Sequence, residues 1–77
     1  MAVSHFKKLD VRPLLARGEE PCAPVEAALA ALKPGWGLTV LAPFLPSPLI
    51  ERLKASGCSA RAERRSDATW QVDFWRG

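Results

Sequence analysis

Hydrophobic and polar positions follow strand-like patterns in two early segments of the chain. Apolar and polar residues alternate from Leu9 to Arg12, and Pro13 then limits the continuation of a strand. Residues 38–41 (LTVL) are apolar at almost every position, which is typical of a strand that other elements cover. The polar stretch 16–21 (ARGEEP) reads as a loop. We therefore expect strands at residues 9–12 and 38–41.

Between these strands the spacing of apolar residues becomes helical. They recur at intervals of three and four, which places four of them on one face of a helix: Val25, Ala28, Leu29 and Leu32. Pro24 suits the first helical position, because a helix needs no backbone N–H there. The sequence Lys33-Pro34-Gly35 then ends the helix with a cation and two residues that do not continue it.

A second helix is predicted from Pro48 to about Ser56. Ser47 is a suitable N-cap with Pro48 after it, and Gly57 suits the left-handed residue that closes a helix. The apolar stripe of this helix consists of Leu49, Ile50 and Leu53.

Two strands complete the pattern. Small and polar residues alternate over residues 58–63, and Ser66-Asp67-Ala68 has the composition of a hairpin turn. In residues 70–75, Trp70, Val72 and Phe74 share one face, while Trp75 lies on the other. The order of elements is β-α-β-α-β-β. It predicts an α/β fold of the α+β two-layer sandwich type, with two helices on one face of a four-stranded mixed sheet and the other face more open.

Length, composition and cysteine content limit the classes of protein to which this chain can belong. We expect one domain over residues 1–77, with its core at about 9–75, because 77 residues are the length of one domain. So short a chain leaves little room for a deep cleft, which argues against an elaborate multi-substrate enzyme. The net charge is +3, and no apolar run has the length of a signal peptide core or a membrane span. We expect a cytoplasmic protein without a membrane partner. Since Cys22, Cys58 and the single histidine are scattered, we expect neither a metal nor another cofactor.

Four segments in this order resemble the TusA/SirA-like sulfur-carrier superfamily: LDVR, PCAPVEAALAALKPG, GLTVLAP and SPLIERLKASG. The resemblance covers Leu9 to Trp75 and implies the order of the strands. In that superfamily a Cys-Pro-x-Pro motif opens the first helix, and its cysteine carries a persulfide. Here the motif reads Pro21-Cys22-Ala23-Pro24, so that Pro21 takes the carrier position and the cysteine follows it. The chain is therefore similar to an uncharacterised branch, a domain of unknown function that lacks the standard register.

Cys22 is the candidate persulfide carrier. Its position beside a helix N-terminus predicts a stabilised thiolate, with Arg12 and Arg17 in support and Glu19 and Glu20 in opposition. The alternative is a small residue that fills a turn between two prolines, and we favour this alternative because free cysteines are commonly buried apolar residues. Cys58 is interpreted as a packing residue.

The turn before the second helix is a candidate partner surface. Where the uncharacterised branch often has a polar His-Asp-Pro-type turn, this chain has the apolar Phe44 and Leu45 between two prolines. These two side chains, with Pro21 and Pro24, either form an exposed docking patch or fold back over the core. Trp75 also has two interpretations. It either adds an apolar surface on the open sheet face or caps the end of the sheet.

Basic and aromatic residues raise a third and weaker hypothesis, that the chain is a basic RNA-binding domain. Phosphate-binding cations and stacking platforms for bases are both present in the sequence: Lys7, Lys8, Arg61, Arg64, Arg65, Arg76, Trp36, Trp70 and Trp75. Acidic residues interrupt the basic group and no recognition motif occurs, so we expect solvated surface charges and no nucleic-acid partner.

Two functions follow as expectations. The resemblance implies a sulfur carrier that exchanges a persulfide through Cys22 with sulfur donor and acceptor proteins. The alternative is a non-catalytic module that binds a protein or a small ligand and has lost the carrier chemistry. In both cases the chain is a carrier or a binding module rather than an enzyme.

Overall fold

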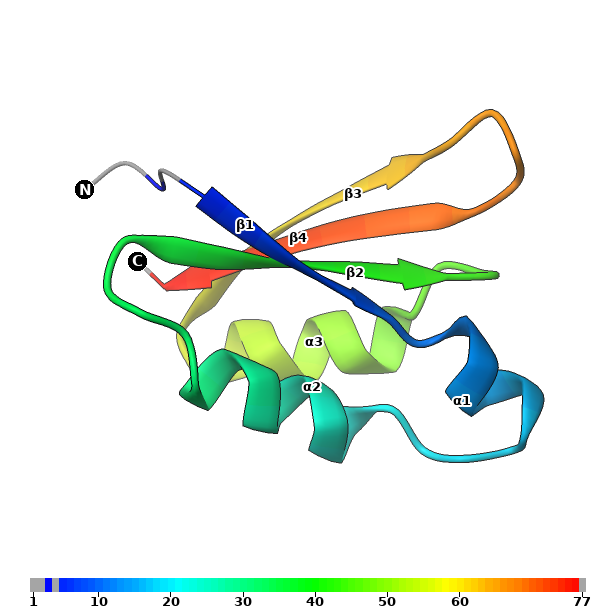
Figure 1. Ribbon diagram of the computed structural model, residues 1–77, viewed down its shortest axis with the longest axis horizontal. Coiled ribbons are helices and arrows are strands. Elements are labelled where there is room, and N and C mark those ends of the chain that lie inside the picture. Colours follow the sequence, from blue (N-terminus) through cyan, green and yellow to red (C-terminus); the bar gives the residue numbers. More distant parts are fainter. Residues whose placement is uncertain (1–2, 4, 77) are drawn as a thin grey trace.

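A four-stranded sheet with helices on a single face forms the protein (Figure 1). The computed structural model describes residue 3 and residues 5–76. The strands are β1 (His5–Asp10), β2 (Trp36–Ala42), β3 (Cys58–Arg64) and β4 (Trp70–Arg76), and the helices are α1 (Arg12–Ala16), α2 (Cys22–Ala30) and α3 (Ser47–Ala55). The α+β two-layer architecture is as predicted, with the short α1 in addition to the two expected helices.

The strands lie in the order β1-β2-β4-β3, so the strand that comes last along the chain is in the interior of the sheet. β1 pairs with β2 in parallel, and β4 pairs antiparallel with both β2 and β3. The register places Leu38 opposite Phe74 and Val40 opposite Val72, on the face that the helices cover. With the helical stripes they form one core: Val11, Val25, Leu29, Leu38, Val40, Ala42, Leu49, Leu53, Val72 and Phe74.

The prediction of the first strand is wrong at both ends. β1 begins four residues earlier, at His5, and Arg12 is the first residue of α1. The early residues of β1 are exposed and show no apolar alternation, but their backbone pairs with β2 from His5 opposite Trp36 onward. Pro13 does not only end the strand, since it occupies the first turn of α1, where a missing N–H costs nothing.

Both long helices begin earlier than predicted. α2 begins at Cys22 rather than Pro24, because Pro24 lies within the first turn, where proline is tolerated. α3 begins at Ser47, so Ser47 is not the N-cap. Pro46 occupies that position without a side-chain hydrogen bond, and the Ser47 N–H donates to the carbonyl of Leu45 at 2.9 Å.

The sheet face opposite the helices carries a polar network around Asp73. This carboxylate is only 4% exposed although no helix covers it. It accepts hydrogen bonds from the hydroxyl of Thr39 at 2.7 Å, from Arg61 at 3.0 Å and from the amide of Gln71 at 3.3 Å. Neighbouring side chains therefore bury the carboxylate of Asp73 on a sheet face that no helix covers.

An aromatic pair lies beside this network on the same face. Phe6 and Trp75 meet edge to face with ring centroids 6.4 Å apart. The Phe6 ring lies over Gly37, because a Cβ atom at that position would be 2.5 Å from a ring carbon. The alternative left open for Trp75 is thus resolved, since its ring lies on the open face and packs against Phe6.

Candidate functional site

The predicted site residues lie at one end of the molecule, in two segments. β1 and β2 are parallel, so the segments that follow them reach the same end of the sheet (Figure 1). Pro21, Cys22 and Pro24 are half-buried at the start of α2. Phe44 and Leu45 lie on the loop between β2 and α3.

The N-terminus of α2 is occupied by the side chain of Glu20. One oxygen of its carboxylate accepts a hydrogen bond from the backbone N–H of Cys22 at 2.5 Å, and the other accepts from Ala23 at 3.3 Å. These free N–H groups are the donors that would stabilise an anion at a helix start. Glu20 is thus the anion that they bind, which leaves a thiolate of Cys22 without this stabilisation.

The electrostatics of Cys22 are the opposite of the expectation from sequence. The hydrogen bond of its thiol to Glu20, together with partial burial and the negative charge of Glu20, raises the pKa of Cys22. Arg52 opposes the shift but does not reverse it. The same hydrogen bonds lower the pKa of Glu20, so the carboxylate is charged and the thiol protonated at neutral pH.

Arg52 belongs to a contact that the sequence analysis missed. Its Nε donates to the carboxylate of Glu26 at 3.1 Å, which joins α3 to α2 beside Cys22. Arg52 is exposed and Glu26 is partly exposed, so we expect this pair to contribute little to stability. Spacing along either helix gives no signal for it, because the partners are 26 residues apart.

Replacing Glu20 by glutamine is expected to lower the pKa of the Cys22 thiol and to accelerate its alkylation at neutral pH severalfold. The amide removes the negative charge that disfavours the thiolate. The measurement is the rate of iodoacetamide labelling against pH, with Cys58→Ser as background so that a single thiol reacts. Glu19→Gln is the matched control, because Glu19 binds Arg17 instead. Identical pH profiles for Glu20→Gln and the parent would contradict the role of Glu20.

The loop between β2 and α3 exposes both of its large apolar residues. Phe44 is 51% exposed and Leu45 is 41% exposed, so these side chains do not fold back over the core. Pro46 is buried and anchors the loop, with φ −82° and ψ 67° in a tight turn. Phe44 and Leu45 therefore project from a backbone of restricted freedom.

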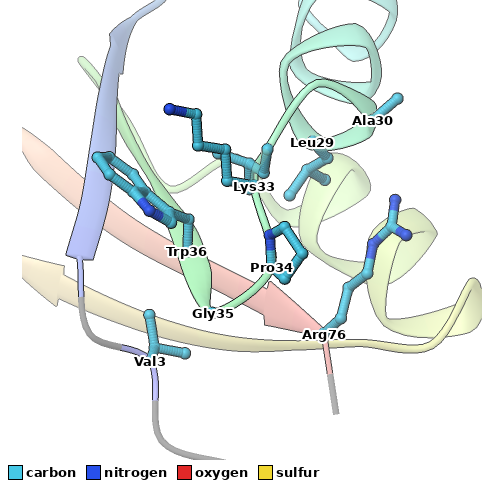
Figure 2. Close-up of a pocket in the computed structure, with 9 residues that line it drawn as sticks. Val3, Leu29, Ala30, Lys33, Pro34, Gly35, Trp36 and Arg76 are labelled. Atoms are coloured by element: carbon cyan, nitrogen blue, oxygen red, sulfur yellow. The ribbon is translucent and has the colours of Figure 1, made fainter.

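Two hollows lie at the other end of the molecule. The first has a volume of about 300 Å³ and is formed by the end of α2, the turn before β2 and Arg76 (Figure 2). The second, of about 380 Å³, lies between the helices and contains Cys58 and Arg76. Neither hollow contains Cys22. Both cysteines are free thiols.

In residue 3 and residues 5–76, no three His, Cys, Asp or Glu side chains gather as a metal site would require. Within the same residues, no helix has the length and apolar content needed to cross a membrane.

The fold and this site together define a small α+β domain with a single thiol at the start of its first long helix and an exposed apolar loop at the same end of the molecule. The chain belongs to the family described as "Uncharacterized conserved protein (DUF2249)", whose model matches residues 8–76. Comparisons with curated proteins and with solved structures gave no match. The relationship to the TusA/SirA-like superfamily stays a prediction.

Proposed function

We propose that this domain is a non-catalytic binding module that takes a protein partner on the loop between β2 and α3. The partner offers an apolar cleft for Phe44 and Leu45. The observation that carries the proposal is the exposure of both side chains on a loop that prolines hold in shape. Association then costs little conformational entropy, and a buried aromatic anchor contributes strongly to binding.

The state of Cys22 supports a binding function over a carrier function. A persulfide carrier needs a thiolate at neutral pH, and Glu20 raises the pKa of this thiol. The thiol is also partly buried against the core, as a packing residue would be.

One observation favours the carrier as a second candidate. The guanidinium of Arg52 opposes the rise in the pKa of Cys22, and a partner that displaced Glu20 would leave this cation and the free N–H groups to stabilise a thiolate. Incubation with a cysteine desulfurase and free cysteine tests this function. A mass gain of one sulfur atom on the Cys58→Ser protein, absent from Cys22→Ser, would support a carrier.

Replacing Phe44 by aspartate is expected to weaken binding of the partner by tenfold or more, because a carboxylate does not enter an apolar cleft without a large desolvation cost. A photo-reactive amino acid at Leu45 captures the partner in its native lysate, and the purified partner is then titrated. Ser66→Asp is the matched control, since it adds the same charge to the hairpin turn between β3 and β4. Equal affinities for the two variants, or no specific crosslink, would overturn the proposal.

A further inference from the structure

Cations and aromatic rings gather at the end of the molecule opposite the loop 43–46. This basic–aromatic end consists of residues 5–8 at the start of β1, residues 33–37 around the start of β2 and residues 74–76 at the end of β4. The pairing of the strands brings the three segments together, since His5 lies opposite Trp36 and Leu38 lies opposite Phe74. Sequence order alone separates them widely.

Basic residues dominate the charge of this end. It contains Lys7, Lys8, Lys33 and Arg76, and the acidic residue that adjoins its aromatic pair, Asp73, is already paired with Arg61. Within the described part of the chain, none of these four cations forms an ion pair. α2 ends just before Lys33, and the partial negative charge of a helix C-terminus, about half a unit, offsets only part of this charge.

Two aromatic platforms lie among these cations. On the open sheet face, the ring of Phe6 lies over Gly37 and meets Trp75 edge to face. Phe6 remains 40% exposed. At the edge of the sheet, Trp36 stacks on His5 with ring centroids 5.0 Å apart and an angle of 22°. Figure 2 shows the Trp36 indole and the Arg76 side chain on opposite sides of Pro34, around the first hollow.

We propose that the basic–aromatic end binds single-stranded nucleic acid. The exposed ring of Phe6 and the half-buried ring of Trp36 offer stacking surfaces to bases, and unpaired cations beside them attract the phosphates. A duplex keeps its bases stacked, so only a single strand uses the rings. A second copy of the chain is a poorer occupant of the open face, because a buried carboxylate network around Asp73 fills the centre where a dimer interface would be apolar.

The proximity of these basic and aromatic residues is visible in the structure but not in the sequence. Basic and aromatic residues are scattered along the chain, and the prediction of solvated charges rested on the acidic residues between them. In the fold these acidic residues lie elsewhere, and Phe6 and Trp75 share a face. The proposed site is also distinct from the loop 43–46, since the two lie at opposite ends of β2. Either proposal therefore fails or succeeds without the other.

The test is a fluorescence anisotropy titration of the full chain with a fluorescein-labelled oligothymidylate of about 15 nucleotides, a length that covers typical single-strand sites. If the four cations each neutralise one phosphate, log K falls against log salt with a slope of about −2.8. Affinity then drops about 50-fold between about 50 and about 200 mM salt. Absence of binding at the lower salt concentration would overturn the proposal.

Matched variants distinguish phosphate binding at the basic–aromatic end from attraction by the net positive charge of the whole protein. Lys8→Gln with Lys33→Gln is expected to reduce the slope to about −1.4. Arg64→Gln with Arg65→Gln removes the same charge from the far hairpin and is expected to leave the slope unchanged. Equal slopes for the two double variants would contradict the placement of the site.

An abasic oligonucleotide of the same length separates stacking from phosphate attraction. It is expected to bind about tenfold more weakly than oligothymidylate, and Phe6→Leu is expected to remove most of that difference. Phe6→Leu keeps an apolar side chain over Gly37, and its circular dichroism spectrum confirms the fold. Equal affinity for the abasic chain would overturn the proposal in favour of an acidic protein or another polyanion.

Discussion

Replacing Phe74 by alanine is expected to lower the free energy of unfolding by about 3–5 kcal/mol. Phe74 is fully buried and lies in the middle of the core, opposite Leu38 on β2 and Ala60 on β3. Its removal leaves a cavity between the sheet and the helices. Since domains are stabilised by roughly 0.05–0.15 kcal/mol per residue, this loss is a large fraction of the total for such a short chain. Urea denaturation followed by circular dichroism measures it.

The same substitution at Phe44 is the control for this experiment. Phe44 is half-exposed on the loop between β2 and α3, so Phe44→Ala is expected to change stability by no more than about 0.5 kcal/mol. If Phe74→Ala does not fold, Phe74→Leu retains most of the volume and is expected to cost less than about 1.5 kcal/mol. Equal losses at positions 74 and 44 would show that Phe74 is not the centre of the core.

The elements of the core were predictable because their apolar residues have a clear period. Val25 and Leu29 of α2, and Val72 and Phe74 of β4, lie on the predicted faces. The start of β1 was not predictable, since His5–Lys8 has one apolar residue and is held by backbone pairing with β2. The interior place of β4 is likewise a property of the tertiary structure, and the pattern of residues predicted no strand order.

The candidate site was predicted in position but not in electrostatics. Cys22 does stand at a helix start, as its place between prolines indicated. The usual signal for a capping side chain is a Ser, Thr, Asp or Asn immediately before the helix, and here Pro21 stands there. Glu20, one residue earlier, reaches the same N–H groups. The usual capping signal is therefore absent from the sequence, and the direction of the pKa shift was missed.

Replacing Gly37 by valine is expected to lower the free energy of unfolding by about 1–3 kcal/mol, through overpacking. A Cβ atom there would be 2.5 Å from the ring of Phe6 and 2.9 Å from the backbone carbonyl oxygen of Phe74. The ring can move aside, but the carbonyl belongs to the interior strand β4 and cannot. Chemical denaturation measures the loss, and the emission of Trp75, recorded in a Trp36→Phe, Trp70→Phe background, reports the displacement of Phe6.

A double variant divides this cost between the two contacts. Phe6→Ala with Gly37→Val removes the ring and is expected to recover part of the lost stability, while the contact with the carbonyl of Phe74 persists. If Gly37→Val is as stable as the parent protein and Phe6 has not moved, the close approach of the Phe6 ring and the Phe74 carbonyl to position 37 is contradicted.

The interior position of β4 has a consequence for folding during synthesis on the ribosome. Until residues 70–76 have been synthesised, β2 has a vacant hydrogen-bonding edge and β3 has no neighbour to pair with. The nascent chain therefore cannot close its sheet gradually from one side. It acquires its structure in a late step, and until then the apolar edge of β2 is a site for association with other chains.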